Sequence, residues 1–477
     1  MRKTKIIATI GPATSSKEML SRLFEAGCNV VRINMSHSSQ EEAAQIIAAV
    51  RSISTRVGIL LDTRGPEVRT TEVAEEVELI AGREVKIRGE EGMTTAELVR
   101  VNYSGFHRSM EAGGTILLAD GRIQLEVLST AADCLHCQVV VGGTLGSKKG
   151  VNVPGVKLPM PFLSEQDISD IQFGVAQKVD FVAASFVSDP EDVLRIRELV
   201  AEEGGQVSII SKIEARYAIK NLADIIAVSE GIMVARGDLG VEIAAEEVPV
   251  VQKQMIDACR GAGKVVIVAT EMMESMIQNP RPTRAETSDV ANAVFEGADA
   301  IMLSAETSVG AFPTEAVATM ARIAQTSEAE VARRQRTWPG DRRAHNISDL
   351  VCKGAWLAAR ELNISAILVP TSTGRTARRM SRYRPSAPIL VTTPDMAVAR
   401  SLALNYAVHA LSTRHYGRME NMIRRSCQLM VDAGWINEDN LIAVVCGVPV
   451  GRSGNTNLMT LQQVSALLGQ QKVDPPV

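Results

Sequence analysis

Two short apolar segments of the sequence end in charged residues of the kinds that bind metal ions and phosphate groups. The first ends in Lys212 and Glu214, and the second ends in Arg236 and Asp238. Such charges are costly to bury unpaired, so they indicate a site and not a plain strand end. The carboxylates of Glu214 and Asp238 are hard oxygen ligands of the type that Mg²⁺ takes, with water and substrate filling its other positions. Lys212 and Arg236 would supply positive charge beside a phosphate.

Polar residues follow other apolar segments in the same way. Four of them offer one charged and several neutral side-chain oxygens, a mixture that suits a monovalent cation better than Mg²⁺: Asn34, Ser36, Asp62 and Thr63. The segment GDLG at 237–240 would expose backbone N–H groups suited to a carboxylate. The sequence has no P-loop, protein-kinase or dinucleotide-binding motif, so a nucleotide would be held in another way.

The spacing of the apolar segments predicts the elements that bring these residues together. Eight apolar segments alternate with helical stretches, which is typical of a parallel sheet covered on both sides. Eight such units indicate a (β/α)8 TIM barrel, in which the polar strand ends converge at one mouth. The predicted strands are Lys5–Ile10, Val30–Ile33, Val57–Leu61, Phe181–Ala184, Val207–Ile210, Ile232–Ala235, Val265–Ala269 and Ala300–Leu303.

Two interruptions divide the sequence further. Between 70 and 150 the segments become short, alternating and punctuated by glycine, which indicates an all-β lid domain inserted after the third barrel strand. A basic segment with proline and glycine at 333–345 indicates a linker, and further βα units after it predict a doubly wound α/β domain. The expected domains are the barrel at 1–69 and 151–335, the lid at 70–150 and a C-terminal α/β domain at 346–477.

Composition excludes several classes of function. Aromatic residues make up 3% of the 477 residues and the net charge is −4, which argues against nucleic-acid binding and against recruitment to an anionic membrane. The sequence has no apolar run of the roughly 18 residues that a membrane span needs. The basic N-terminus leads into a predicted strand, not a signal peptide, and the seven cysteines are scattered as in reduced proteins. We therefore expect a cytoplasmic protein.

Six segments, in order and with matching spacing, resemble the pyruvate kinase family over nearly the whole chain. They are KIIATIGPAT at 5–14, RINMSH at 32–37, LDTRGPEVRT at 61–70, IISKIE at 209–214, IMVARGDLGVEI at 232–243 and ATEMMESM at 269–276. The layout of barrel, lid and C-terminal domain is also similar. The resemblance implies transfer of the phosphoryl group of phosphoenolpyruvate to ADP, giving pyruvate and ATP in the last step of glycolysis.

The resemblance also implies roles for individual residues. Lys212 would stabilise the phosphoryl group in flight, and Thr270 would lie near the methylene carbon that becomes protonated. A lysine kept charged beside phosphate and carboxylates is a poor base, so we interpret Lys212 as an electrostatic group. The implied sites are Glu214 and Asp238 for Mg²⁺ (or Mn²⁺), and Arg32, Lys212, Gly237, Asp238 and Thr270 for the substrate.

Two further sites at the barrel mouth follow from the resemblance. The monovalent cation would be K⁺, held by Asn34, Ser36, Asp62 and Thr63. Relatives with Glu at the position of Glu67 tend to need K⁺, whereas those with Lys supply the charge themselves, so we expect K⁺ dependence. The implied nucleotide-binding residues are Arg32, Asn34, His37, Arg69 and Lys149, although His37 has the alternative of a purely structural role.

The C-terminal domain carries a candidate regulatory site. The turn TSTGRT follows its first predicted strand, and a hydroxyl-rich, glycine-containing turn at a helix start is suited to an anion. In relatives this turn binds the phosphate of an effector, and a second loop, here 447–457, covers it. We expect a phosphorylated activator, a sugar monophosphate or AMP, bound by Thr371, Ser372, Thr373, Gly374, Arg375 and Thr376. Five arginines between 375 and 384 would assist or form a solvated helix face. The resemblance also implies a homotetramer.

Two rival functions use the same residues differently. A Mg²⁺-dependent 2-oxo acid lyase or aldolase on a TIM barrel would need the Glu214 and Asp238 pair, but it leaves Lys212, the monovalent-cation site and the lid without a role. A metabolite sensor without catalysis would be expected to have lost catalytic residues at the barrel mouth. ADP dependence separates the first rival from a kinase.

Overall fold

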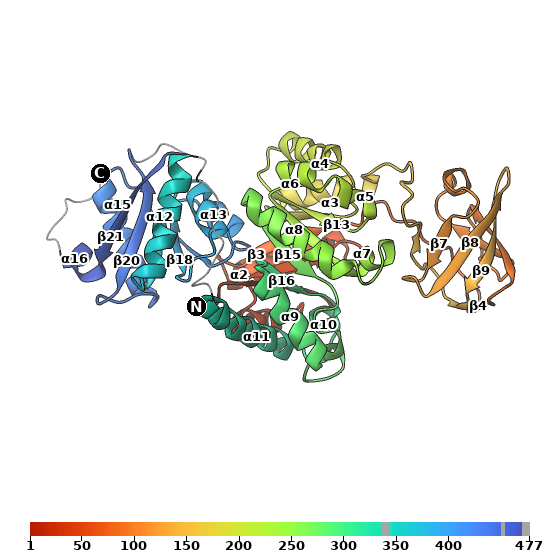
Figure 1. Cartoon of the computed structure of the whole chain (residues 1–477), viewed down its shortest axis with the longest axis horizontal. Coiled ribbons are helices and arrows are strands. Elements are labelled where there is room, and N and C mark those ends of the chain that lie inside the picture. The colour runs from red at the N-terminus through yellow and green to blue at the C-terminus, as the bar shows by residue number, and fades with distance from the viewer. Residues whose placement is uncertain (335–343, 345, 450–453, 470–477) are drawn as a thin grey trace.

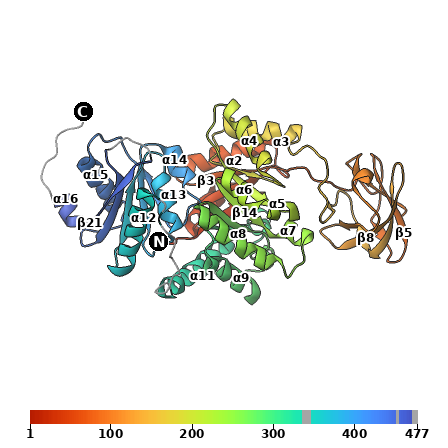
Figure 2. The same cartoon turned by 45° about the horizontal axis from the view of Figure 1, so that its top comes forward.

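The computed structural model describes residues 1–334, 344, 346–449 and 454–469. Three parts lie in a row, with the barrel between the β lid at one end and the C-terminal α/β domain at the other (Figures 1 and 2). The predicted linker at 333–345 falls almost entirely outside the described residues. In the part of the chain that the structure describes, no helix has the length and apolar character of a membrane span.

The barrel is a closed sheet of parallel strands in the order β1-β16-β15-β14-β13-β12-β3-β2. All eight predicted strands are confirmed, and the largest difference is that β13 continues through Lys212 to Ile213. The bounds are β1 (Lys5–Thr9), β2 (Val30–Asn34), β3 (Gly58–Asp62), β12 (Phe181–Ala184), β13 (Ser208–Ile213), β14 (Gly231–Ala235), β15 (Val265–Ala269) and β16 (Ala300–Leu303).

Both faces of the barrel strands are buried, which explains why their sequences are continuously apolar. In β3, Leu60 belongs to the cluster that fills the barrel interior, while Ile59 and Leu61 belong to the cluster under the helices. Successive side chains of a strand point to opposite faces, so each face receives every second residue. An apolar residue is therefore favoured at every position until the strand reaches the mouth.

Helices cover the outside of the barrel, and their ends follow local sequence signals. The predicted cap at Asp189 is confirmed, because its side chain accepts a hydrogen bond from the Asp192 N–H in a capping box with Pro190 in the first turn. The helices are α1 (Lys17–Ala26), α2 (Gln40–Ile53), α3 (Glu165–Ala176), α4 (Pro190–Glu202), α5 (Arg216–Lys220), α6 (Leu222–Val228), α7 (Arg236–Glu242), α8 (Val248–Ala262), η2 (Glu274–Ile277), α9 (Arg284–Glu296), α10 (Ala305–Ser308) and α11 (Pro313–Arg334).

The lid is a mostly β insertion between β3 and β12 with its own core. Its strands form a sheet in the order β11-β7-β8-β9-β5-β6 and a small pair, β10-β4. The chain leaves and re-enters the barrel side by side, since Arg69 bridges Gly150 and the Thr70 N–H donates to the Lys149 carbonyl at 2.8 Å. The elements are β4 (Val77–Leu79), β5 (Glu84–Gly89), β6 (Leu98–Val101), η1 (Phe106–Ser109), β7 (Thr115–Leu118), β8 (Ile123–Thr130), β9 (Leu135–Val141), β10 (Gly143–Leu145) and β11 (Val151–Asn152).

The C-terminal domain has one sheet, in the order β19-β18-β17-β20-β21, with helices on both faces. Its last strand, β21, runs antiparallel to β20 and was not predicted, because its sequence TNLMTLQQ mixes polar and apolar residues without a clear period. The elements are α12 (Ile347–Glu361), β17 (Ala366–Pro370), α13 (Arg375–Arg382), β18 (Ile389–Thr393), α14 (Met396–Ser401), β19 (Val408–Ser412), α15 (Met419–Asp432), β20 (Leu441–Gly447), β21 (Thr456–Gln463) and α16 (Val464–Gly469).

The C-terminal domain packs against the amino-terminal end of the barrel strands, opposite the mouth where the polar strand ends lie. Leu404 is fully buried in the cluster that fills the barrel interior. Two ion pairs connect the parts: the buried pair of Arg384 with Asp299 at 2.6 Å, and the partly buried pair of Arg400 with Asp180 at 2.8 Å. The barrel therefore depends on the C-terminal domain to close its floor.

Candidate active site

The candidate residues lie at the mouth of the barrel, directly after the apolar side chains that fill its interior. A strand residue two positions after an interior residue points to the same face. Four strands thus carry a polar side chain above an apolar one at the mouth: Arg32 above Val30, Asp62 above Leu60, Ser185 above Ala183 and Lys212 above Ile210. The convergence expected from the strand ends follows from this alternation.

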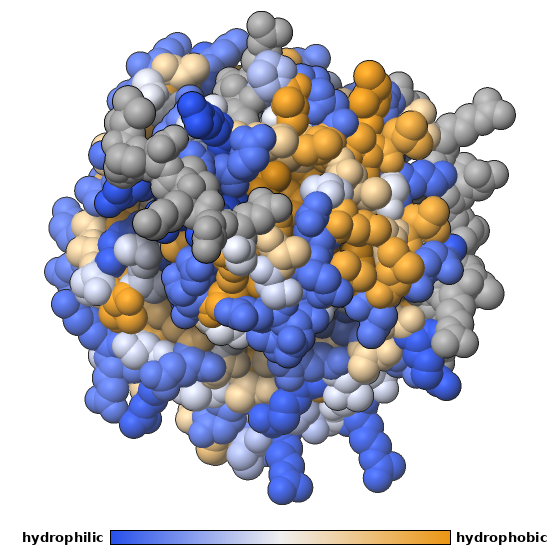
Figure 3. All heavy atoms as spheres, turned by 90° about the vertical axis from the view of Figure 1, so that its left-hand side faces the viewer, coloured by the Kyte–Doolittle hydropathy of each residue, from blue (hydrophilic) through white to orange (hydrophobic). Residues whose placement is uncertain are grey.

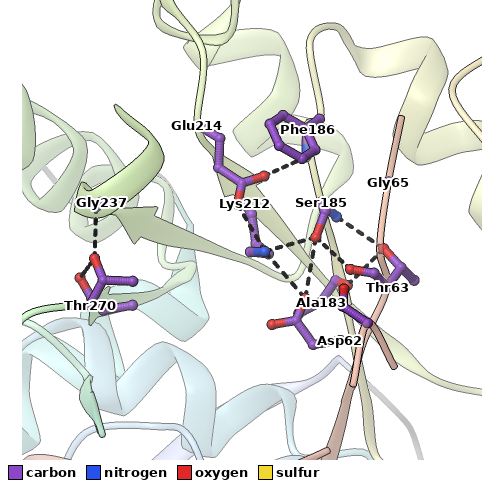
Figure 4. A network of polar contacts seen from close by, with 12 residues as sticks. Asp62, Thr63, Gly65, Ala183, Ser185, Phe186, Lys212, Glu214, Gly237 and Thr270 are labelled. Carbon is purple, nitrogen blue, oxygen red and sulfur yellow. Dashed lines mark hydrogen bonds and ion pairs between the residues drawn. The ribbon is translucent and has the colours of Figure 1, made fainter. Parts of the chain in front are cut away.

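The ammonium group of Lys212 lies among three oxygen acceptors (Figure 4). Its Nζ is 2.8 Å from Glu214 Oε1, 2.7 Å from Ser185 Oγ and 3.3 Å from Asp62 Oδ1. Burial alone lowers the pKa of a lysine, but the Asp62 and Glu214 carboxylates outweigh it and raise the pKa of Lys212. Lys212 therefore stays charged at neutral pH, and it is suited to stabilise negative charge, not to accept a proton.

The carboxylate of Asp62 is fully buried and is shared by two cations. Its Oδ2 accepts a hydrogen bond from Arg32 Nε at 2.6 Å, while its Oδ1 faces Lys212. Arg32 also donates through Nη1 to Thr9 Oγ1 at 3.1 Å. Burial raises the pKa of an aspartate, but Arg32 and Lys212 outweigh this effect and lower the pKa of Asp62. Asp62 is therefore an ionised group that fixes both cations.

The buried Glu214 and the partly buried Asp238 form an acidic pair that fits a divalent cation. Burial raises the pKa of Glu214 and of Asp238; the nearby Asp238 carboxylate adds to this for Glu214, and Lys212 offsets part of it for both. Arg32 and Lys212 balance Asp62 and Glu214, so Asp238 leaves one negative charge for a cation to compensate. The described residues contain no cluster of three or more His, Cys, Asp or Glu ligands. The donors therefore fit Mg²⁺, which takes one or two carboxylates, better than a zinc-type site.

The turn after β15 fixes the start of α7, which carries Asp238. Thr270 has a φ of 66°, which is rare for a β-branched residue, and its Oγ1 accepts a hydrogen bond from the Gly237 N–H at 2.8 Å (Figure 4). The same oxygen donates to the Ala269 carbonyl at 2.6 Å. Strained backbone of this kind is concentrated at functional sites. The structure thus brings Thr270, Gly237 and the first turn of α7 together.

The side chain of Arg236, expected to supply positive charge beside a phosphate, is engaged by protein partners in this structure. Its Nη1 lies 2.8 Å from Asp289 Oδ1 and its Nη2 lies 2.7 Å from the Thr270 carbonyl. Its charge is therefore paired with Asp289 of α9, and its contact with the Thr270 carbonyl supports the turn after β15. Asp289 is distant in sequence, so no local pattern could reveal this pairing.

Comparisons with known proteins agree with this geometry. The family profile described as "Pyruvate kinase, barrel domain" matches residues 1–317, and "Pyruvate kinase, alpha/beta domain" matches residues 349–462. The chain belongs to the pyruvate kinase family. The pyruvate kinase of Bacillus licheniformis is 45% identical over 479 residues, covering 98% of this chain and 82% of that protein. The pyruvate kinase of Clostridium acetobutylicum is 43% identical over 474 residues, covering 97% of this chain and 100% of that protein.

Membership of the pyruvate kinase family makes this chain a phosphotransferase. It removes the support for the two rival functions, a 2-oxo acid lyase or aldolase and a sensor without catalysis. The resemblance seen in the six sequence segments is confirmed by full-length similarity to proteins of this name.

The pyruvate kinase residues expected at the K⁺ and nucleotide sites lie in two groups. Asn34 and Asp62 are opposite each other on β2 and β3, Thr63 follows Asp62, and the Ser36 N–H donates to Asn34 Oδ1 at 3.1 Å. The second group lies where the lid joins the barrel. It consists of Arg69, which pairs with Glu67 at 2.8 Å, and Lys149, which is exposed. Arg32 is buried in the Lys212 network, and His37 is exposed after β2.

The expected effector turn lines a cavity in the C-terminal domain. Five of the six expected residues line it, and the sixth, Gly374, has a φ of 75° and precedes the first residue of α13. The opposite wall was not predicted from sequence, and it comes from the segment after β19: Thr413, Arg414, His415 and Tyr416. Gly454 and Asn455 of the expected covering loop also line the cavity, whereas 450–453 lie outside the described residues.

The basic cluster near this turn is only partly available to a ligand. Arg378 donates to the Thr373 carbonyl at 3.0 Å and to Ser401 Oγ at 2.8 Å. Arg379 pairs with Asp349 at 2.9 Å, and Arg384 pairs with Asp299. The alternative of a solvated helix face is therefore wrong for Arg378 and Arg379, and Arg384 lies after the end of α13 at Arg382. Arg375 is the member that lines the cavity.

Sequence reasoning left three features of the barrel mouth without a role. Ser185 contacts Lys212, and the Phe186 N–H donates to Glu214 Oε2 at 2.6 Å. Burial is the main cause of the raised pKa of Asp238, and the carboxylates of Glu67 and of Asp120, in a turn of the lid, add to it. The sequence signal for Asp120 was the turn ADG after an apolar strand. In the structure this turn has positive φ at Ala119 and Asp120.

Proposed function

We propose that this chain transfers the phosphoryl group of phosphoenolpyruvate to ADP, producing pyruvate and ATP. The observation that carries the proposal is the Lys212 ammonium, held in a buried network next to the acidic pair of Glu214 and Asp238. Phosphoryl transfer needs positioning and charge stabilisation more than covalent chemistry from the protein. A permanently charged lysine beside a divalent-cation site supplies both.

Each residue at the mouth has a role in this proposal. Glu214 and Asp238 hold Mg²⁺ (or Mn²⁺), which supplies Lewis-acid stabilisation of the anionic substrate when bound. Lys212 stabilises the phosphoryl group in transfer, and Arg32 contacts the same group. The backbone groups of Gly237 and Asp238, at the start of α7, bind the substrate carboxylate. Thr270 lies near the methylene carbon and orients the water that protonates it.

The K⁺ site is proposed at the ends of β2 and β3. Asn34, Ser36, Asp62 and Thr63 provide its oxygens, supported by the pairing of Asn34 with Asp62. The proposed nucleotide contacts are Arg32, Asn34, His37, Arg69 and Lys149. Glu67 brings no positive charge to the mouth, because it is an acid paired with Arg69. The proposed K⁺ would supply the positive charge that a lysine at this position would bring.

Pyruvate release should require phosphoenolpyruvate, ADP, a divalent cation and K⁺ together. We expect omission of ADP to stop release, because the phosphoryl group then has no acceptor, and replacement of K⁺ by a bulky organic cation to lower the rate strongly. The measurement is pyruvate formation coupled to a dehydrogenase, with each component omitted in turn. Release without ADP would contradict the kinase proposal, and equal rates in K⁺ and the organic cation would contradict only the K⁺ site.

A phosphorylated metabolite, a sugar monophosphate or AMP, is proposed as an activator bound by the 371–376 turn. We expect it to raise the rate at low phosphoenolpyruvate through a coupling of about 1–3 kcal/mol. Arg375→Gln should abolish the response and leave the basal kcat unchanged, because Arg375 lines the cavity. Arg382→Gln, on the same helix, is the matched control. A flat titration with all these compounds would contradict the activator proposal.

We also propose that the chain assembles as a homotetramer. Apolar side chains gather on the end of the molecule formed by the C-terminal domain (Figure 3). The exposed apolar residues of α12 include Ile347 at 69% and Leu350 at 62% exposure, and β21 is the last strand of its sheet. A second copy of this chain would cover such a surface. Light scattering checks the assembly.

A cytoplasmic location is also proposed. It is supported by the seven cysteines, all of which are buried and free.

The proposed domain boundaries are supported by the bridge between Arg69 and Gly150. They are 1–69 and 151–335 for the barrel, 70–150 for the lid and 346–477 for the C-terminal domain. Protease cleavage at exposed junctions would test these boundaries.

A further inference from the structure

Ser185 occupies a central place in the Lys212 network (Figure 4). It follows β12 directly and is 1% exposed. Its Oγ lies 2.7 Å from Lys212 Nζ, 2.7 Å from the Thr63 carbonyl and 3.3 Å from Asp62 Oδ1. Its own N–H donates to Thr63 Oγ1 at 3.1 Å. Both its backbone and its hydroxyl are therefore fixed by neighbouring strand ends.

The protons in this network can be assigned from chemistry. An ammonium group only donates, so Ser185 Oγ must accept from Lys212 Nζ. The hydroxyl then has one proton of its own, and the Thr63 carbonyl at 2.7 Å is a better acceptor for it than Asp62 at 3.3 Å. A lone pair of Ser185 is thus held toward Lys212 by a backbone carbonyl.

The three acceptors of Lys212 differ in the other groups that they bind. Glu214 is also a proposed ligand of the divalent cation, and Asp62 is already shared with Arg32 and lies farthest from Nζ. The contact with Glu214 is therefore open to exchange when the metal binds, and the contact with Asp62 is the longest of the three. Ser185 is neutral, is not a proposed metal ligand and is anchored to the backbone of Thr63, so it offers Lys212 a fixed acceptor.

We propose that Ser185 is a positioning residue that holds the Lys212 ammonium in place for phosphoryl transfer. It keeps one N–H of Lys212 occupied by a fixed acceptor and directs the remaining N–H groups toward the anionic partners and the transferred group. The inference depends on the role of Lys212 in the proposed function. It goes beyond that role because it names the group that sets the position of the ammonium.

The experiment is a double-mutant cycle with Ser185→Ala and Lys212→Met in the full chain. We expect Ser185→Ala to lower kcat by about 10–100-fold, the loss typical of a hydrogen bond to a charged group, with a much smaller change in KM for phosphoenolpyruvate. In the Lys212→Met background, Ser185→Ala should have no further effect, because the hydroxyl acts through the ammonium. Ser185→Thr, which keeps a hydroxyl, should recover part of the activity.

Controls separate positioning from folding. Ser188→Ala removes a hydroxyl from the same segment, one that contacts the Phe186 carbonyl at 3.3 Å and not Lys212, and should change kcat less than two-fold. Thermal unfolding shows whether each variant is folded. The inference is overturned if Ser185→Ala keeps kcat within two-fold, or if its loss is the same with and without Lys212. If Lys212→Met alone keeps full activity, the proposed function has failed instead.

Discussion

Replacing Lys212 by methionine is expected to lower kcat for pyruvate formation by about 10³-fold or more. Methionine has a similar length but no charge, so the variant removes the ammonium that the Asp62 and Glu214 carboxylates keep protonated. Its absence should act mainly on the transition state, where negative charge spreads over the transferred group. The KM for phosphoenolpyruvate should therefore change much less than kcat.

The measurement is ADP-dependent pyruvate release by the purified variant. Lys253→Met, on the exposed side of α8, makes the same chemical change away from the mouth and should keep full activity. Because Lys212→Met leaves Asp62 and Glu214 buried without their shared cation, circular dichroism must show that the variant is folded. Activity within ten-fold of the parent would remove Lys212 from the mechanism.

Arg384→Ala is expected to cost about 3–5 kcal/mol of the free energy of unfolding. Arg384 Nη1 and Nη2 lie 2.6 Å and 2.7 Å from the two oxygens of Asp299, and both side chains are about 5% exposed or less. Asp299 also accepts N–H groups from Val266 and Tyr406, so it cannot turn toward water. Removing the guanidinium leaves a buried carboxylate without its cation.

Urea unfolding followed by tryptophan fluorescence measures this loss, because Trp356 and Trp435 both lie in the C-terminal domain. Arg382→Ala, two residues earlier, is the matched control and should cost less than about 1 kcal/mol. The double variant Arg384→Met with Asp299→Asn should recover part of the stability, since it removes both charges. A loss below about 1 kcal/mol for Arg384→Ala would show that the pair contributes little.

Much of the barrel could be predicted because its elements depend on local patterns. The eight strands are apolar on both faces, and Lys212 and Glu214 stand out because they interrupt this pattern. The antiparallel strand β21 was missed, because it lies at the edge of its sheet and lacks a continuous apolar sequence.

The contacts that long-range packing decides could not be predicted. The partner of Arg236 is Asp289 on a different helix, and the role of Ser185 appears only when β12 lies beside β3 and β13. The same holds for the far wall of the effector cavity, which comes from the segment after β19. Sequence patterns specify which face a residue occupies, but not which distant residue meets it there.

The bridge between Arg69 and Gly150 holds the two ends of the lid together, and this affects how the barrel strands on either side of it pair. Thr63 and Ala183 meet in the barrel although they are 120 residues apart in sequence. The lid between them brings its own ends together, as in the contact between Thr70 and Lys149 across 79 residues, and it has a separate core. If the lid forms early, it more than halves the open loop that must close, which lowers the entropic cost by about 0.6 kcal/mol or more. The insertion thus shortens the effective contact order of β3 and β12 and favours their pairing during synthesis.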